Sequence, residues 1–92
     1  MTKNSTKHPR HVEGYSGSLE DLAKAIGNMA YDQTSEFIGR LAGDIKSQAE
    51  KDLARGRTKL ASKLNEAAFK LQQAQNSMHS AWKICEPFMK EE

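Results

Sequence analysis

The sequence predicts an all-α protein, either an antiparallel helical hairpin or a small three-helix bundle with a disordered N-terminal arm. Three observations lead to this fold class. Apolar residues recur at helical spacing from residue 18 onward, glycine at position 56 interrupts that pattern, and a heptad repeat then continues for four repeats. A long helix with a heptad repeat must cover its apolar seam, and the simplest cover is the helix that precedes it.

The composition predicts one thin domain that uses alanine as core filler. Leu, Ile, Val and Phe together contribute 15 of the 92 residues, and the net charge is only +2. A share of these residues below ~20% indicates disorder only when the net charge is also high. A small core favours self-association, so the pairing of two copies into a four-helix bundle is one prediction.

Residues 1–17 are expected to form a flexible basic arm. They are polar and aperiodic, with Pro9, Gly14 and Gly17 as helix breakers. Such an arm is either an ordinary frayed terminus or a means of docking to acidic surfaces. A single helical domain is expected over residues 18–92, with helices at about 18–28, 31–55 and 57–86.

The first helix is predicted to begin at Ser18. Asp21 stands three positions later, as in a capping box, and Glu20 adds negative charge where the helix dipole favours it. Gly27 and Asn28 are typical of a helix stop. The apolar stripe of this helix consists of Leu19, Leu22, Ala23, Ile26, Met29 and Ala30.

The second helix is predicted to end at Gly56, with Arg55 where the helix dipole favours a cation. Its apolar stripe can continue that of the first helix, so a single kinked helix over residues 18–55 is an alternative. Gly39 and Gly43 lie one turn apart and either permit close helix approach or are tolerated destabilising residues. The stripe consists of Phe37, Ile38, Leu41, Ile45, Ala49 and Leu53.

The third helix carries the clearest pattern in the chain, which we term the predicted seam. Its members are spaced alternately by four and three positions over four heptads. Pro87 is expected to close the helix near Glu86, which gives a helix roughly 45 Å long over residues 57–86. The predicted seam consists of Leu60, Leu64, Ala67, Leu71, Ala74, Met78, Ala81, Cys85 and Phe88.

The chain shows no catalytic or metal-binding pattern, so it is expected to be non-enzymatic. Cys85 has His79 as its only nearby base in sequence, and six residues along a helix place the two side chains about 120° apart. His8 and His11 have no neighbouring cysteine or carboxylate pair that would complete a tetrahedral metal site. No glycine-rich phosphate loop occurs. We therefore expect no cofactor, no metal and no small-molecule substrate.

A cytoplasmic protein is expected from the cysteine count and the hydropathy. The single cysteine, Cys85, excludes an intramolecular disulfide and fits a reducing compartment. No apolar run approaches the ~18 residues of a transmembrane helix, and no apolar stretch follows the basic N-terminal residues as in a signal peptide. No membrane partner is therefore expected.

Charge is distributed unevenly along the chain. Residues 18–45 carry five acidic and two basic side chains, whereas residues 46–63 carry six basic and two acidic ones. The basic side chains would gather at the tip of a hairpin, either as solvated cations that complement the helix dipole or as ligands for phosphates or an acidic protein. We term the candidate contact residues the basic cluster: Lys51, Arg55, Arg57, Lys59 and Lys63.

A second candidate surface consists of apolar residues that the predicted seam does not explain. Phe69 falls opposite the predicted seam, and the helix around Trp82 is apolar over most of its circumference. Aromatic and methionine side chains are favoured at interface centres, although an internal core is the simpler interpretation of Trp82. We term these residues the apolar set: Phe69, Trp82, Phe88 and Met89.

These features predict a non-enzymatic protein-interaction module, which acts as an adaptor or as an inhibitor that occludes a partner protein. A phage or mobile-element protein directed at a host nucleic-acid-binding complex is one form of such an inhibitor. The alternatives are a small basic nucleic-acid-binding protein that uses the hairpin tip, and a structural homo-oligomeric helical bundle.

Overall fold

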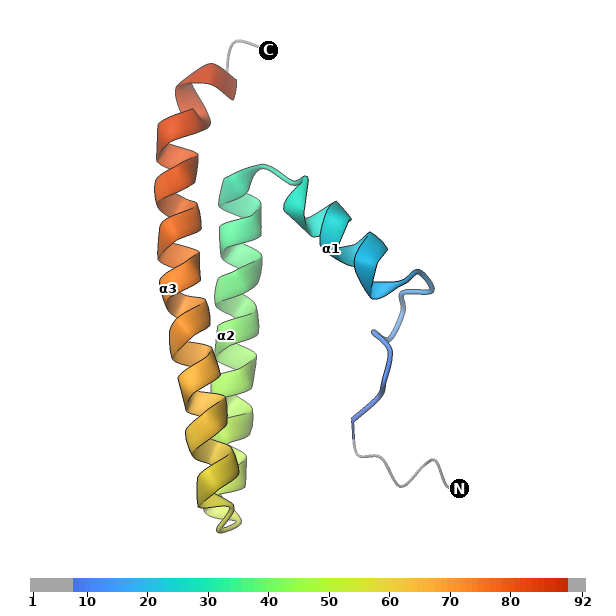
Figure 1. Cartoon of the computed structure of the whole chain (residues 1–92), viewed down its shortest axis with the longest axis vertical. Coiled ribbons are helices and arrows are strands. Elements are labelled where there is room, and N and C mark those ends of the chain that lie inside the picture. Colours follow the sequence, from blue (N-terminus) through green and yellow to red (C-terminus); the bar gives the residue numbers. More distant parts are fainter. Residues whose placement is uncertain (1–7, 90–92) are drawn as a thin grey trace.

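A computed structural model of the chain describes residues 8–89, apart from the side chain of Met89, so the first seven residues of the predicted arm lie outside the description. Within that range it contains three α-helices and no strand: α1 over Leu19–Gly27, α2 over Tyr31–Ala54 and α3 over Thr58–Met89. α2 and α3 lie side by side and antiparallel, and α1 leaves the N-terminal end of α2 at an angle (Figure 1). The predicted all-α helical hairpin is therefore confirmed.

Local capping signals set the ends of α1. The Ser18 Oγ accepts a hydrogen bond from the Asp21 backbone N–H at 3.0 Å, as the capping pattern predicts. The helix ends at Gly27, and residues 28–30 link it to α2. α1 and α2 are therefore separate helices, and the alternative of one kinked helix over residues 18–55 is wrong.

The turn between α2 and α3 is a Schellman motif centred on Gly56. The Gly56 N–H donates to the Leu53 carbonyl oxygen and the Arg57 N–H donates to the Asp52 carbonyl oxygen, both at 2.9 Å. Gly56 has a φ of +82°, a left-handed conformation that glycine adopts without steric cost. Across the same turn, the Arg57 guanidinium forms an ion pair with the Asp52 carboxylate at 3.1 Å. The predicted end of the second helix at Gly56 is confirmed.

α2 and α3 pack through small side chains that recur every seven residues. The Ser35 Oγ donates a hydrogen bond to the Gln75 carbonyl oxygen at 3.0 Å, and this bond defines the register of the pair. In an antiparallel pair each step along one helix is matched by a step back along the other, so buried alanines face each other. The buried alanines that this register places opposite one another are Ala42 with Ala68 and Ala49 with Ala61.

The predicted seam is half-buried at every second position, and its other positions are exposed except for Ala81, which is half-buried. The first of these halves is a half-buried column, which we term the shared column: Leu64, Leu71, Met78 and Cys85. In its other half Leu60 is 46% exposed and Phe88 is 67% exposed, while Ala61, one position after Leu60, is buried instead. Alanines occupy both the exposed positions 67 and 74 and the buried positions 61 and 68, so the heptad pattern alone does not show which alanines contact α2. The turn does, because it starts α3 where Ala61 falls opposite Ala49. We term the displaced positions the open column: Leu60, Ala67, Ala74, Ala81 and Phe88.

α3 continues through Pro87 to Met89, so the predicted helix end near Glu86 is wrong. Proline fixes φ near the helical value, and it lacks one N–H donor for the hydrogen bonds of the helix. Only two helical residues follow Pro87, so the loss is confined to the last turn of α3. The last turn of α3 tilts away from the axis of the preceding turns (Figure 1). This tilt relieves the clash between the proline ring and the carbonyl four residues earlier.

The molecule is a flat layer with a core of alanine. Its extents are 53 × 29 × 14 Å, so it is much thinner in one direction than in the other two. α1 contacts α2 and does not contact α3. Every Leu, Ile, Phe, Met and Trp side chain that the structure describes is half-buried or exposed, and the buried apolar residues are alanines. The layer therefore leaves its large apolar side chains at the surface.

Candidate functional site

An apolar groove lies between α1 and the first turns of α2. It has a volume of about 410 Å³, and its lining carries a single polar side chain. That side chain is Thr34, whose Oγ1 donates to the Ile26 carbonyl oxygen at 2.7 Å and so ties the end of α1 to α2. We term this cavity the α1–α2 groove. It is lined by Leu19, Leu22, Ala23, Ile26, Gly27, Thr34, Phe37 and Ile38.

The α1–α2 groove stays open because α1 is short and has a single neighbour. α1 is nine residues long, and none of its residues is buried. It contacts α2 alone among the other helices. A helix of this length is not stable by itself in water, so its position depends on what its apolar side chains touch.

The helices that form the α1–α2 groove carry excess negative charge. Lys24 pairs with Glu20 at 3.6 Å and Arg40 pairs with Glu36 at 2.8 Å, each pair one turn apart within its own helix. These ion pairs use both basic side chains of residues 18–45. Asp44 lies in the cavity at the basic tip, so the acidic residues left over on α1 and the first turn of α2 are Asp21 and Asp32, and residues 18–40 carry a net charge of −2 (four acidic against two basic side chains).

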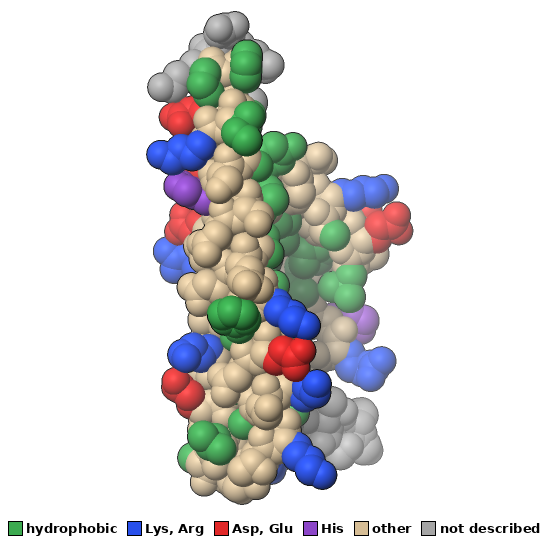
Figure 2. Space-filling model, turned by 60° about the vertical axis from the view of Figure 1, so that its left-hand side comes forward, with side chains coloured by type: hydrophobic (Ala, Val, Ile, Leu, Met, Phe, Trp, Pro, Cys, Tyr) green, Lys and Arg blue, Asp and Glu red, His purple; other side chains and the backbone are tan. Residues whose placement is uncertain are grey.

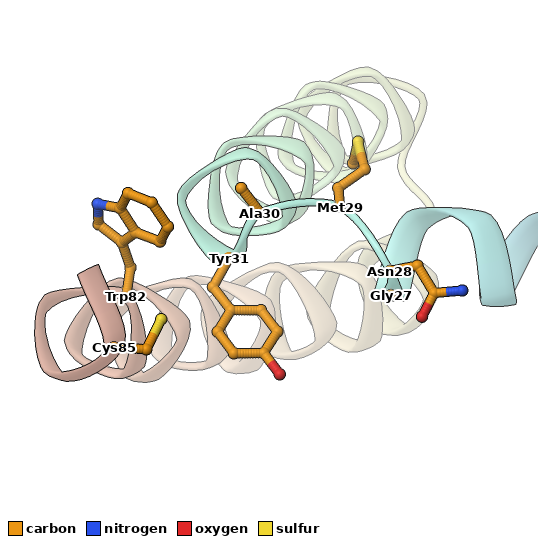
Figure 3. Close-up of a pocket in the computed structure, with 7 residues that line it drawn as sticks. All are labelled: Gly27, Asn28, Met29, Ala30, Tyr31, Trp82 and Cys85. Carbon is orange, nitrogen blue, oxygen red and sulfur yellow. The ribbon is translucent and has the colours of Figure 1, made fainter. Parts of the chain in front are cut away.

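A second cavity, of about 340 Å³, lies at the open end of the hairpin. Trp82 and Cys85 reach it from α3, Tyr31 reaches it from the first turn of α2, and residues 27–30 complete its lining (Figure 3). Both Trp82 and the free cysteine are half-buried. α3 extends beyond the start of α2 at this end, with no described helix beside its last turns (Figure 1).

The structure does not bring the apolar set together on one surface. Phe69 is 63% exposed and lines a third cavity, together with the polar side chains of Lys46 and Gln72. Trp82 is half-buried at the open end of the hairpin, and Phe88 is exposed on the last turn of α3. The side chain of Met89 lies outside the described residues.

Glycines of α2 form one wall of the cavity beside Phe69. A Cβ added at Gly39 would meet the amide end of the Gln75 side chain, which is flexible and can move aside. A Cβ added at Gly43 meets nothing, so this glycine is not required by packing. Neither glycine is therefore shown to be required for close approach of the two helices.

The basic cluster is divided between two places. Lys51, Arg55 and Arg57 converge on a shallow polar cavity beside the turn, but the acidic Asp44 and Asp52 share it. Arg57 is the residue that pairs with Asp52 across the turn. Positive charge at the tip is therefore partly neutralised within the cavity.

The two other members of the basic cluster, Lys59 and Lys63, lie on the first turns of α3, away from that cavity. Lys63 pairs with Glu66 at 3.1 Å, and Lys70 pairs with the same carboxylate at 3.0 Å. Hydrogen bonds from Lys70 and Lys63 hold the pKa of Glu66 below its ordinary value.

Apolar and basic side chains are unevenly distributed over the face that Figure 2 shows. Hydrophobic side chains gather at the C-terminal end of α3 and along its border with the helices behind it, whereas Lys and Arg side chains surround the lower part of the hairpin (Figure 2). Among residues 8–89, no group of three His, Cys, Asp or Glu side chains is placed to hold a metal ion. In the same range, no helix is both long and apolar enough to cross a bilayer.

Comparison with known proteins identifies no relative: no family model matches the chain, and no curated protein or solved structure is significantly similar to it. The function must therefore be inferred from the geometry of its surfaces.

The α1–α2 groove is the candidate site that the sequence did not predict. Both of its walls were present in the predicted apolar stripes, as Leu22 and Ile26 on one side and Phe37 and Ile38 on the other. What the pattern lacks is the angle between the two helices, which residues 28–30 set. A break between two amphipathic segments is the signal that would have pointed to a groove.

Proposed function

We propose that the protein is a non-enzymatic protein-interaction module whose α1–α2 groove binds a helix of a partner protein. The observation that carries this proposal is the uncovered apolar face of α1, a nine-residue helix with no buried residue that is held against α2 alone. A third helix laid in the groove covers that face and stabilises α1 in place.

The partner helix is expected to be amphipathic and basic. A groove between two helices accepts apolar side chains that recur at i, i+3, i+4 and i+7 of the bound helix. The net charge of −2 over residues 18–40 (four acidic against two basic side chains) attracts lysine and arginine on the other face of that helix. Exposed charges of this kind act more on the association rate and the choice of partner than on affinity.

Binding of this kind suits an adaptor or an inhibitor, because neither role needs a reacting group. An adaptor would hold the partner helix while its other surfaces remain free. An inhibitor would occlude a helix that the partner uses for its own contacts. In both cases the chemistry of recognition is the same, an apolar stripe flanked by positive charge.

Two synthetic peptides test the proposal. Both are helices of about 14 residues with leucine on one face, and they carry either lysine or glutamate on the other face. The lysine peptide is expected to bind about tenfold more tightly than the glutamate peptide at low ionic strength, as measured by fluorescence anisotropy. Tighter binding of the glutamate peptide would contradict the predicted partner chemistry.

A matched pair of variants locates the binding site. Leu22→Asp places a carboxylate in the α1–α2 groove and is expected to weaken binding of the lysine peptide about tenfold or more. Phe69→Asp introduces the same charge outside the groove and is expected to leave binding unchanged. If both variants bind the peptide equally well, the groove is not the site. Circular dichroism of each variant confirms that the hairpin is folded.

Nucleic-acid binding is the second candidate function, because Lys51, Arg55 and Arg57 converge beside the turn. Replacing all three by glutamine is expected to abolish binding of duplex DNA and RNA and to remove its salt dependence. Affinity that survives this change would exclude the tip as a nucleic-acid site. The presence of Asp44 and Asp52 in the same cavity makes this candidate the weaker one.

A further inference from the structure

The helices of the described chain lie in a single layer, so each long helix is covered on one flank and leaves its broad faces without a further helix. The smallest extent of the molecule is 14 Å, less than half of its width of 29 Å, and α2 and α3 lie side by side in the broad plane (Figure 1). Domains are normally built from two or more packed layers, because a helix must bury its apolar stripe against another element. A second layer is therefore missing from the isolated chain.

α3 shows where a second layer would pack. The alanines at positions 61 and 68 face α2, the shared column is half-buried, and the open column ends in the exposed residues Leu60 and Phe88. The shared and open columns together form a heptad seam that continues without interruption for four repeats. A seam of this regularity packs against another helix along its whole length.

The length of this seam identifies its occupant. From Leu60 to Phe88 it extends about 42 Å, so the helix that covers it must be about as long. α1 has nine residues, and α2 has 24 and already faces the alanines of α3. α3 itself has 32 residues and is the helix of the described chain that matches the seam in length and in heptad pattern.

We infer that a second copy of the chain packs its α3 antiparallel against this seam, about a two-fold axis at Ala74. The two-fold axis places Leu60 of each copy opposite Phe88 of the other, so the exposed residues at the two ends cover each other. Ala67 of each copy lies opposite Ala81 of the other, which permits close approach at the centre. In the shared column, the same axis pairs Leu71 with Met78 and Leu64 with Cys85.

The position of α2 favours the antiparallel orientation. In an antiparallel pair of α3 helices, the same flank of each helix lies on the same side of the pair. Both α2 helices therefore fall on one side, and the two hairpins stack as layers. In a parallel pair the hairpins would point in opposite directions and leave their apolar faces uncovered. On the outer flank of the antiparallel pair, Lys70 lies across from Ser77 and Lys63 across from Ile84. Ile84 is 74% exposed, and the methylene groups of lysine can cover it.

The exposed area of the chain is sufficient for such an interface. The chain exposes 7319 Å², whereas a compact monomer of 10.3 kDa exposes about 5,400 Å². Part of the difference belongs to the non-helical segment before α1. A standard interface buries about 800 Å² of each partner, which is less than half of the excess.

Molar mass measured by sedimentation equilibrium tests the proposal. The wild-type chain is expected at twice 10.3 kDa. Ala74→Glu brings two carboxylates together at the two-fold axis and is expected to give a monomer, whereas Asn76→Glu adds the same charge on another face of α3 and leaves the dimer intact. Should Ala74→Glu prove unfolded by circular dichroism, Phe88→Ser serves in its place, with dimer affinity expected to fall about tenfold. A monomeric wild-type chain, a folded Ala74→Glu chain that remains dimeric, or a Phe88→Ser chain with unchanged dimer affinity overturns the proposal.

The native cysteine tests the orientation. In the antiparallel dimer the two Cys85 thiols are about 30 Å apart along the seam, so copper-phenanthroline oxidation is expected to leave the wild-type chain uncrosslinked. Leu64→Cys places a second thiol opposite Cys85 of the other copy and is expected to give a disulfide-linked dimer on a non-reducing gel. A crosslinked wild-type dimer, or no crosslink with Leu64→Cys, rules out this arrangement.

The dimer test and the peptide test of the proposed function can fail separately. Stacked layers bring the N-terminal halves of the two α2 helices together near the α1–α2 groove, so a second copy and a partner helix compete for the same face. The peptide assay is therefore run on the Ala74→Glu chain, in which every groove residue is unchanged.

Discussion

Replacing Ala68 by leucine is expected to destabilise the hairpin, whereas replacing its neighbour Ala67 by leucine is not. Ala68 is 6% exposed and lies opposite Ala42, while Ala67 is exposed on the open column. Leucine at position 68 adds three carbon atoms where two backbones are separated by two methyl groups. The helices must then move apart locally or the side chain must leave its preferred rotamer. Overpacking of this kind costs about 1–3 kcal/mol of unfolding free energy.

Thermal denaturation followed by far-ultraviolet circular dichroism measures the difference. In a domain of this size 1 kcal/mol corresponds to roughly 4–8 °C in Tm, so Ala68→Leu is expected to lower the Tm by about 4–24 °C. Ala67→Leu is expected to stay within about 0.5 kcal/mol of its parent. Both changes are made in the Ala74→Glu chain, so that self-association does not contribute. If Ala67→Leu proves the more damaging change, the predicted seam is right and the observed register is wrong.

Three further predictions concern the turn, the attachment of α1 and a surface carboxylate. Gly56→Ala is expected to lower the free energy of unfolding by about 1–2 kcal/mol because its φ is +82°, whereas Gly43→Ala, with free space around it, is expected to raise it by about 0.5–1 kcal/mol. Urea denaturation measures both, and changes of equal sign would contradict the turn geometry. Thr34→Val removes the hydroxyl that holds the end of α1 and is expected to speed hydrogen exchange in α1 but not in α3; unchanged exchange in α1 would mean that apolar contacts alone hold it. Lys70→Gln removes the hydrogen bond that contributes most to the lowered pKa of Glu66, so the NMR titration midpoint of Glu66 is expected to rise. Because that pKa is lowered in the folded state, its stabilisation is present above the ordinary carboxyl range and is lost as the pH falls through the folded pKa. Lys70→Gln should therefore reduce the loss of stability on acidification, and a midpoint that does not move would contradict the contact.

The helix ends that depend on local chemistry could be predicted from the sequence. A serine followed by acidic residues marked the start of α1 at Ser18, and a glycine marked the turn at Gly56, because both signals act through backbone groups a few residues away. Pro87 was interpreted by the same local rule and gave the wrong end. The rule describes the cost of proline inside a helix, and that cost is small where only two residues follow.

The packing of α3 could be predicted only in part, because its apolar stripe is wider than one partner covers. The heptad pattern identified the shared column. This column lies between the column that contains Ala61 and the open column that contains Leu60, so it is part of the contact whichever of the two packs against α2. Selecting Ala61 rather than Leu60 as its neighbour requires the register of the turn, which is a property of two helices together. The α1–α2 groove escaped prediction for the same reason, since it depends on an interhelical angle.

The register fixed at Gly56 has a consequence for the order in which the hairpin forms. Contacts from the turn outward close successively longer loops, from the pair Ala49 and Ala61 to the pair Ser35 and Gln75, which are 40 residues apart. Closing the outer loop costs about 1 kcal/mol more in chain entropy than closing the inner one. The contacts between α2 and α3 are therefore expected to form first at the tip and last at the open end, and to break in the reverse order. The open end forms last and carries α1 and Trp82. The candidate binding surfaces therefore lie in the part of the hairpin that local unfolding exposes at the lowest cost in free energy.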